Sequence, residues 1–470
     1  MRRAGDAARL LRHAGPSLIA QLVIVEAALA VVPLATIAVI GIIVGRVADD
    51  ASVGAPLVLL SLLLLLQQVL GPVRAALTYR ITRRVDGAVR ARVMDVANGS
   101  LGIAPFEDPE TLDRLELAGG TIDPFWGASP GGAAVGVVSL GGRYVQLGGA
   151  AVLLARLSWP VAAGLTATVL FAYSRSRRWN RVRLRAIREN HVAGRFSRYT
   201  SGLANTPPAA KEVRVFGALE WLEERFRQQW AEVSGARLVA WRWASTRVTL
   251  LIVAMTPAVA VAFVLTARIG SERAVSTRTL AVALQAAIAL FSLLFDQRQD
   301  DAYQVDFGLE ALDTLRTLEE SLGDDKARRG TLDADGLPRE HIRFEGVRFA
   351  YPGSEHEVFA GLDLTIPAGS SLAIVGENGA GKTTLVKLLA RLHEPQAGAI
   401  SIDGIPVDAL DPTSWRRRLA VIFQDFVRYE LPAADNVGFG GIGRIPDPGA
   451  LDAAAARAGA LDVIHRLPSG

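Results

Sequence analysis

Uncharged apolar runs dominate the chain before about residue 297, and arginine-rich stretches separate several of them. An α-helix needs about 20 apolar residues to cross the hydrocarbon core of a bilayer. Six runs approach or exceed this length, and they predict six membrane-spanning helices. The runs are Leu18–Val44, Pro56–Val73, Gly136–Leu157, Trp159–Tyr173, Val248–Ala267 and Leu280–Phe295.

The connections between the predicted spans differ in length and charge. Arg74–Arg114 and Arg175–Arg242 are long and rich in arginine, whereas Val47–Ala55, Leu157–Ser158 and Arg268–Arg278 are short and carry fewer positive charges. Positive residues are enriched in loops on the cytosolic side of membrane proteins. We therefore expect a multi-pass membrane protein whose N-terminus, two long connections and C-terminal domain are cytosolic.

A cleaved signal peptide is the alternative interpretation of the N-terminus. Arg2 and Arg3 fit its charged start, and Ala28-Leu29-Ala30 fits its small-residue cleavage pattern. The apolar run continues to Val44, however, which is too long for a signal-peptide core and long enough to span a bilayer. The sequence therefore favours an uncleaved first helix.

Helical periodicity continues through the two long connections, over Arg80–Asn98 and Arg175–Thr200, and neither segment contains proline. We expect these membrane helices to extend well into the cytosol. A short helix is predicted after each extension, at Pro105–Ala118 and at Thr206–Phe226.

The composition changes after Phe295, where a charged helical stretch leads to Gly323–Pro338. Glycine, proline and mixed charge predict a linker there. Beyond it, His341–Gly353 alternates like a β-strand, and a second strand is expected near Leu362–Ile366. The sequence thus predicts a membrane domain at 1–322, a linker at 323–338 and a soluble domain at 339–470.

The soluble domain contains GENGAGKTT, residues Gly376–Thr384, which fits the phosphate-loop pattern GxxxxGK[ST]. A short buried strand is predicted before it at Leu372–Val375, and a helix after it at Thr383–Leu392. Glycines let backbone N–H groups turn toward phosphate oxygens, and the helix N-terminus adds a positive dipole end. Lys382 would place its charge on the outer phosphates, and the Thr383 hydroxyl can bind the accompanying Mg²⁺.

Several other kinds of site are not expected. The chain has no cysteine, and its six histidines are too far apart for metal-ligand spacing on one helix face, so we expect no protein metal site. The net charge of +4 reflects arginines between the apolar runs, so we expect no nucleic-acid binding. Only four of the 51 basic residues are lysine, which is typical of a GC-rich bacterial genome.

The order of six spans, linker and phosphate-loop domain resembles that of ABC transporters of the exporter type. The resemblance covers essentially the whole chain. It implies an all-α six-helix transmembrane domain followed by an α/β P-loop NTPase cassette. It also implies a half-molecule of a transporter in the bacterial plasma membrane, which uses ATP and Mg²⁺ and pairs with an identical or different second half. The implied cargo is an exported small molecule, peptide or lipid, with import as the less common activity.

The same resemblance implies roles for individual residues. Tyr351, in FAYP, is similar to an aromatic that stacks on adenine, and Gln424, in VIFQDF, is similar to a glutamine that approaches Mg²⁺ and links the cassette to the membrane domain. Lys382 and Gln424 are implied to be catalytic, and Thr383 and Gln424 to lie at the metal. The implied nucleotide-binding set is Tyr351, Gly376, Glu377, Asn378, Gly379, Ala380, Gly381, Lys382, Thr383 and Thr384. An ordinary polar or aromatic residue at a strand end is the alternative for Gln424 and for Tyr351.

Two predicted short helices, Pro105–Ala118 and Ala209–Phe226, are similar to the helices of this family that press into the cassettes; plain solvated helices are the alternative. Other motifs of the family are not found in the 470 residues, which contain no LSGGQ signature and no later aspartate–glutamate pair. His465 precedes the place of the signature and is not the switch histidine, and Arg466–Gly470 is similar to the lead-in to the signature. We therefore expect a cassette that is incomplete at its C-terminus, binds ATP weakly and does not hydrolyse it.

Two other functions are retained as alternatives. One is a non-hydrolysing ATP-binding membrane protein, either a partner subunit or the remnant of a transporter. The other is a membrane-anchored kinase or unrelated NTPase, which is disfavoured because it would not need six spans or the spacing of Tyr351 and Gln424. Within the spans, Glu26 is a candidate to meet a cationic cargo, to pair with another helix or to lie in a water-filled cavity. Arg143 is expected to snorkel toward the cytosolic face.

Overall fold

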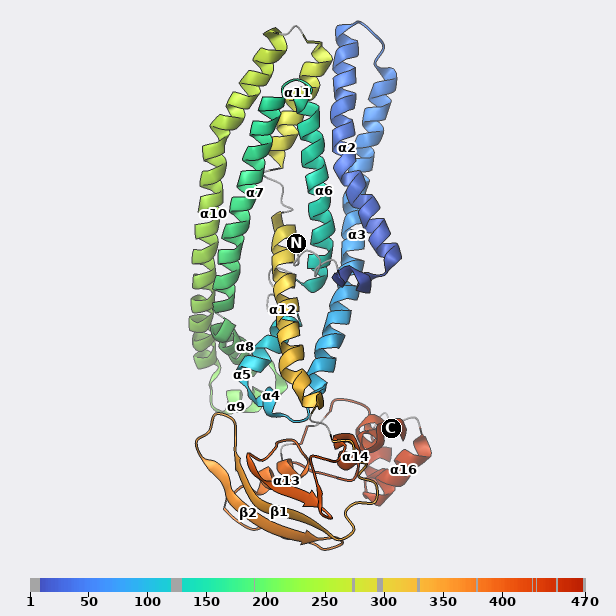
Figure 1. The fold of residues 1–470 in the computed structure, drawn as a ribbon, viewed down its shortest axis with the longest axis vertical. Coiled ribbons are helices and arrows are strands. Elements are labelled where there is room, and N and C mark those ends of the chain that lie inside the picture. The colour runs from blue at the N-terminus through green and yellow to red at the C-terminus, as the bar shows by residue number, and fades with distance from the viewer. Residues whose placement is uncertain are drawn as a thin grey trace. The chain divides into compact units, whose positions relative to one another are not determined.

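The computed structural model describes residues 9–119, 129–189, 191–272, 275–293, 299–327, 330–377, 379–424, 426–427, 429–444 and 447–467. The chain divides into two compact units, Met1–Arg328 and Arg329–Gly470. The first unit is helical, and its long helices run side by side (Figure 1). The second combines a β-sheet with short helices.

The six predicted spans overlap long helices of the first unit. The long helices are α2 (Pro16–Ala48), α3 (Gly54–Asn98), α6 (Pro130–Ala155), α7 (Trp159–Glu189), α10 (Leu219–Glu272), α11 (Thr277–Ser292) and α12 (Gln299–Ala327). Within the described residues, α2, α3, α6 and α10 are long and apolar enough to cross a membrane. Helix α11 is apolar but shorter, and α7 is apolar only over its first half. The last predicted span extends past α11 into residues 294–298, which lie outside the described part.

Short helices make up the rest of this unit. They are η1 (Leu11–Ala14), α4 (Ala104–Glu107), α5 (Pro109–Ala118), α8 (His191–Asn205), η2 (Pro207–Ala209) and α9 (Ala210–Val215). The first predicted short helix is split, because the Asp108 side chain accepts hydrogen bonds from Glu110 N and Thr111 N and so begins α5. The second prediction was wrong beyond α9. Gly217 turns the chain with a φ of +59°, and Leu219 then begins the long helix α10.

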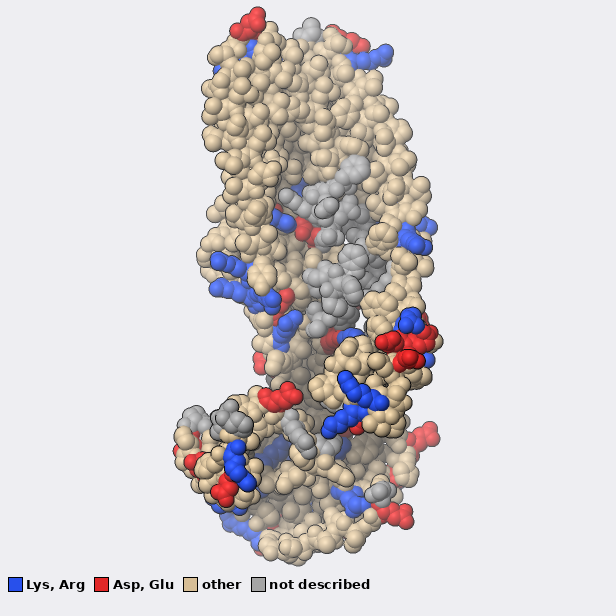
Figure 2. Space-filling model, turned by 180° about the vertical axis from the view of Figure 1, so that it is seen from behind, with Lys and Arg blue, Asp and Glu red and all other residues tan. Residues whose placement is uncertain are grey.

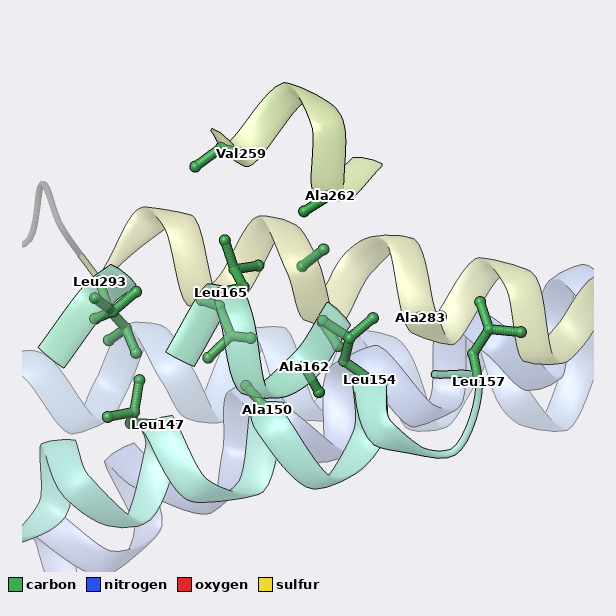
Figure 3. Packing of buried hydrophobic residues seen from close by; sticks show 14 of the residues in the cluster. Leu147, Ala150, Leu154, Leu157, Ala162, Leu165, Val259, Ala262, Ala283 and Leu293 are labelled. Atoms are coloured by element: carbon green, nitrogen blue, oxygen red, sulfur yellow. The ribbon is translucent and has the colours of Figure 1, made fainter. Parts of the chain in front are cut away.

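One core of the first unit lies between α6, α7, α10 and α11, built from leucine, valine and alanine (Figure 3). Leu154, Ala286 and Leu290 are completely buried there. The outward faces are also apolar, and Leu65 and Val58 are each 62% exposed. Figure 2 shows a broad band without charged side chains on one face of this unit. An apolar exterior over an apolar core is typical of a protein surrounded by lipid.

The glycines of α6 explain how this helix packs so closely on its neighbours. A Cβ on Gly136 would lie 2.7 Å from the backbone oxygen of Asp301 on α12, and one on Gly131 would lie 2.6 Å from the backbone of Thr82 on α3. Small residues allow such backbone contact, which is a common way for membrane helices to associate. The glycine-rich composition therefore records helix packing rather than a weak helix.

The second unit is built on an antiparallel sheet in the order β2-β1-β3-β4. The strands are β1 (His341–Ala350), β2 (Glu357–Pro367), β3 (Ala397–Ile402) and β4 (Ile405–Pro406). The helices are α13 (Lys382–Leu389), α14 (Pro412–Arg417), α15 (Ala433–Gly438), η3 (Phe439–Arg444), α16 (Pro448–Arg457) and α17 (Leu461–His465). Both predicted strands are thus confirmed. Phe344 of β1 and Trp415 of α14 are buried in the core of this unit together with Leu388 of α13.

The buried strand predicted at Leu372–Val375 is not present. No strand is assigned to these residues, and Val375 is 94% exposed. The VIFQ segment behaves similarly, because Ile422 is 93% exposed and no strand is assigned there. Strands of this continuous apolar type are stable when neighbours cover both faces and both edges. Among the described residues, no strand pairs with either segment, so their side chains face solvent.

Candidate functional site

The phosphate-loop pattern lies directly before α13, as the sequence predicts. Gly381 is the residue that begins the helix, with a left-handed backbone at φ +85°. Leu385 N donates to Gly381 O over 2.9 Å, which closes the first turn. The loop therefore leads into a helix N-terminus, where free backbone N–H groups and the helix dipole favour an anion. Helix α13 ends at Leu389, earlier than predicted, because Arg391 adopts a φ of +52°.

Glycine is required at one loop position by the neighbouring strand. A Cβ on Gly381 would lie 2.8 Å from Val358 Cγ1 and 2.9 Å from the Phe359 ring, both on β2. Gly379 has a similar φ of +87° but has open space around it. Strand β2 thus presses against the end of the loop and fixes its path, whereas Gly379 supplies conformational freedom alone.

The Lys382 ammonium lies over the loop itself. Its Nζ donates to the carbonyl oxygens of Gly376 at 2.8 Å and Glu377 at 2.6 Å. These bonds direct the Lys382 side chain away from α13 and toward the start of the loop. A positive charge is therefore held within the concave side of the loop, where a phosphate group would meet it.

Tyr351 and the loop meet through the side chain of Thr384. The Tyr351 hydroxyl and Thr384 Oγ1 are 3.0 Å apart, and Thr384 is buried. The Tyr351 ring contacts Phe349 edge-on at 5.1 Å and His393 edge-on at 5.4 Å, and Lys387 Nζ lies 5.1 Å from its centroid. The structure thus places Tyr351 against Thr384 at the phosphate loop, and three other side chains contact its ring.

Lys387 and His393 were not predicted as neighbours of the site. Lys387 lies three residues after Thr384 on α13, so the two share one helix face. That spacing was available in the sequence. His393 follows the left-handed turn at Arg391, however, and a turn of that kind was not foreseen in the sequence.

The end of α13 is fixed by buried arginine contacts. Arg391 is 4% exposed, and its Nη1 donates to Leu410 O over 2.7 Å. Burial lowers the pKa of this guanidinium. Arg416 of α14 donates to Ala390 O and to Arg391 O, which satisfies carbonyls at the C-terminus of α13. Helix α13 is therefore held at both ends, and the loop at its start has a rigid support.

The residues of the loop fit a nucleotide phosphate with Mg²⁺. Thr383 is exposed, so its hydroxyl is accessible, and the Lys382 ammonium is held on the carbonyl oxygens of Gly376 and Glu377. The Thr383 hydroxyl is an oxygen ligand of the kind Mg²⁺ takes while water and phosphate supply most of its other ligands, and Lys382 and the helix N-terminus suit the phosphate itself. Asn378 was also predicted to bind nucleotide, and it lies outside the described residues.

Gln424 is described as an exposed residue in a turn. Within the described part of the chain, it forms no hydrogen bond with the phosphate loop. The structure thus brings Tyr351 to the loop. The role of Gln424 beside the loop remains a prediction.

A second polar cluster lies inside the helical unit, around Glu26. This residue is 2% exposed, and its Oε1 accepts from Arg74 Nε at 2.6 Å and from Ser139 Oγ at 2.6 Å. Arg74 Nη2 also donates to Ser139 Oγ at 2.9 Å and lies 3.3 Å from Asp301 Oδ2. Helices α2, α3, α6 and α12 each contribute one of these side chains. Of the three explanations offered for Glu26, pairing with another helix is the one that the structure contains.

Arg143 does not reach the surface as expected. It is 6% exposed, and its guanidinium carbon lies 5.7 Å from the Tyr173 ring centroid. The snorkelling prediction was wrong because α7 covers this face of α6 and supplies an aromatic ring for the cation.

Known proteins are similar to this chain over one or both of its units. The family model described as ABC transporter matches residues 359–468. The chain is 30% identical over 268 residues to the "ATP-dependent lipid A-core flippase" of Dechloromonas aromatica (strain RCB), covering 55% of this chain and 44% of that protein. It is 26% identical over 332 residues to the protein of the same name from Aromatoleum aromaticum (strain DSM 19018 / LMG 30748 / EbN1), covering 66% and 53%.

A solved structure is similar over nearly the whole chain. It is titled "Structure of a bacterial Atm1-family ABC exporter with ATP bound" and aligns with a TM-score of 0.69 at 20% identity, covering 97% of this chain and 80% of that one. The chain spans about half or less of the length of the curated relatives it matches. The predicted fold class, an α-helical membrane domain followed by an α/β cassette, is confirmed. The chain thus carries a match to the ABC transporter family at residues 359–468, in one polypeptide with a helical membrane domain, and its fold is similar to that of a solved ABC exporter.

Proposed function

We propose that this chain serves as a half-molecule of an ATP-driven exporter in the bacterial plasma membrane. The observation that carries the proposal is the phosphate loop on which Lys382, Gly381 and Tyr351 converge, in one chain with helices of membrane length. A second half, either identical or a related chain, would complete the transporter. Arginine-rich connections support a cytosolic N-terminus and a cytosolic ABC transporter domain.

Each loop residue has a proposed task. Backbone N–H groups of 376–384 bind the phosphates of ATP, and the Lys382 ammonium neutralises charge on the outer phosphates. The Thr383 hydroxyl and the Gln424 side chain hold Mg²⁺, which supplies further charge neutralisation when bound. The Tyr351 ring stacks on the adenine. Gln424 would also report nucleotide binding to the helical unit.

The short helices α4, α5 and α9 are proposed to transmit this signal to the membrane helices by contact with ABC transporter domains. Their sequence positions, after the helical extensions, support this assignment. Closing and opening of the paired ABC domains would then move the helices as rigid bodies. Export of a lipid-like molecule is the proposed direction and cargo class, because matched relatives bear the name lipid A-core flippase.

Hydrolysis is a separate question from binding. The 470 residues contain no LSGGQ run. Chemistry at the outer phosphate depends on groups that position the attacking water and stabilise charge. We propose that the polypeptide of these residues binds Mg-ATP but does not hydrolyse it alone. The alternative function is that of a non-hydrolysing ATP-binding subunit beside a complete partner.

Nucleotide binding by the purified chain tests the proposal. A fluorescent ATP analogue should bind the chain in lipid nanodiscs, and Lys382→Ala should weaken binding at least tenfold. Lys211→Ala, on the exposed short helix α9, is the matched control and should bind as the wild type does. Absence of binding by the wild-type chain would contradict the proposal. A magnesium-dependent steady-state ATPase rate would instead contradict the non-hydrolysing part and leave the transport part intact.

A further inference from the structure

Three arginines of the helical unit stack on an aromatic ring one helical turn away on the same helix. The pairs, with distances from guanidinium carbon to ring centroid, are Arg83 and Tyr79 on α3 at 5.2 Å, Arg175 and Trp179 on α7 at 5.5 Å, and Arg247 and Trp243 on α10 at 4.1 Å. A cation over a ring face is attracted by the ring quadrupole. The same arrangement therefore recurs on three separate helices.

The pairs on α7 and α10 lie where an apolar run meets charged sequence, and Arg83 on α3 lies ten residues beyond the run that ends at Val73. The far end of the apolar part is Gly54 on α3, Trp159 on α7 and Glu272 on α10. The stacked arginine of each helix lies about 29, 16 and 25 residues from that end, in the same order. At about 1.5 Å per residue these separations are about 44, 24 and 38 Å. The hydrocarbon core is about 30 Å thick, and headgroups extend it to about 40–45 Å. The pairs on α3 and α10 thus reach the headgroup region on one side of the bilayer, and the pair on α7 lies toward the same side but nearer the hydrocarbon core.

The sequence around the pairs is mostly positive, and Asp86, which interacts with Arg83 one turn away on α3, is the acid next to a pair. Gly54–Val85, Trp159–Arg188 and Val233–Ser271 contain no aspartate or glutamate. Additional exposed arginines lie close by, including Arg80, Arg178 and Arg242. Near the other end of the spans, by contrast, Asp49, Asp50 and Glu272 accompany the arginines. The positive rim therefore belongs to one side of the membrane.

The stacked arginines are available to bind a ligand. Arg83, Arg175 and Arg247 are exposed, and within the described part of the chain none forms a salt bridge with a carboxylate. Stacking restricts the rotamers of the long side chain before any ligand arrives, which reduces the entropy lost on binding. A planar guanidinium presents parallel N–H groups that match a phosphate. Tyrosine and tryptophan also prefer the headgroup region of a bilayer.

We propose that these three pairs form an interfacial belt that binds the headgroup phosphates of anionic phospholipids in one leaflet. This inference rests on the proposed membrane orientation, which makes that leaflet the cytosolic one, and not on ATP-dependent transport. Anionic lipids supply the negative surface that an arginine-rich rim complements.

Lipid selectivity tests the belt directly. The chain, purified in neutral detergent, is incubated with equal amounts of dioleoyl phosphatidylglycerol and dioleoyl phosphatidylcholine, and the retained lipids are counted by native mass spectrometry. Wild type should retain phosphatidylglycerol several-fold over phosphatidylcholine. R83Q/R175Q/R247Q should lose most of this preference, whereas R83K/R175K/R247K should keep part of it because the charge remains.

A matched triple variant controls for net charge. R225Q/R227Q/R457Q removes three exposed arginines that lie away from the ends of the apolar runs, and it should retain the wild-type preference. Equal retention of both lipids by wild type would overturn the proposal without any variant. A control triple that loses as much preference as the belt triple would overturn it too. So would inorganic phosphate that protects the chain against heat as well as phosphatidylglycerol does. Failure to bind ATP leaves the lipid result unaffected, so the two proposals fail separately.

Discussion

Arg74 Nε lies 2.6 Å from Glu26 Oε1, and this pair joins α2 to α3 inside the helical unit. Glu26 has almost no contact with solvent, while the Arg74 side chain is 21% exposed. Ser139 accepts from Arg74 and donates to Glu26, so its hydroxyl lies between cation and anion. An ionised residue is costly in a membrane domain unless it is paired, and this geometry provides the pair.

Neutralising Glu26 should destabilise the helical unit. Glu26→Gln leaves the Arg74 cation with Asp301 as its remaining carboxylate, and loss of one partner of a buried pair costs on the order of 3 kcal/mol. We expect the apparent melting temperature in detergent to fall by several degrees. Glu110→Gln, which breaks the exposed Glu110–Arg114 pair on α5, is the control. An exposed pair contributes less than about 1 kcal/mol, so this variant should melt close to the wild-type temperature. Equal melting temperatures for Glu26→Gln and wild type would contradict the assignment.

The Glu26 pair also indicates how far the sequence could lead. A buried acid in an apolar run predicted either a partner or a ligand, but Arg74 lies 48 residues away, and only helix packing brings it there. The same is true of Tyr351 and Thr384, which the motif pattern placed in one site and the structure joins by a hydrogen bond. Patterns of apolar residues gave the helices and β1 and β2. The strand predicted at Leu372–Val375 was wrong, because an apolar strand of this kind needs neighbouring strands that are not present among the described residues.

Adding a methyl group at Gly381 should disrupt the phosphate loop. Gly381→Ala combines a strained positive φ with a Cβ placed against Val358 and Phe359, and we expect a loss of about 1–3 kcal/mol in the stability of the second unit. Gly379→Ala has the same backbone strain in open space, so its cost should be smaller, about 1 kcal/mol. Chemical denaturation of the two variants beside the wild type would compare these costs. A more destabilising Gly379→Ala would contradict the role assigned to β2.

Two substitutions at Tyr351 separate its hydroxyl from its ring. Tyr351→Phe removes the hydrogen bond to Thr384, which should cost about 1 kcal/mol of stability, but it keeps the ring for nucleotide stacking. Tyr351→Ala removes both, so affinity for a fluorescent ATP analogue should fall about threefold to tenfold further. Titration of both variants gives the comparison. Equal affinities for Phe and Ala would show that the ring does not contact the base.

Asp403 should contribute a pH-dependent part of the stability of the second unit. Its carboxylate accepts from the backbone N–H groups of Arg339, His341 and Glu340, and these bonds lower its pKa below the usual 3.8. Because the folded-state pKa is depressed, the contribution is present above about pH 4 and is lost as the pH falls through the lower folded value. Asp403→Asn keeps a residue suited to the Asp403–Gly404 hairpin turn but cannot ionise.

The test is denaturation of wild type and Asp403→Asn between pH 3 and 7, with Asp452→Asn on α16 as the control. The difference in stability between wild type and Asp403→Asn should narrow as the pH drops below about 4. The control should show no such narrowing. A difference that stays constant with pH would mean that the charge of Asp403 does not contribute.

Helix α10 has a mechanical consequence that follows from its length alone. Its 54 residues extend about 81 Å without a break, well over twice the thickness of the hydrocarbon core. More than half of the helix therefore lies outside the hydrocarbon core and is continuous with the part inside it. A tilt of about 5° within the membrane would displace a point about 50 Å away by about 4 Å. The helix thus acts as a lever arm, in which small adjustments among lipid-embedded side chains become ångström-scale travel at its far end.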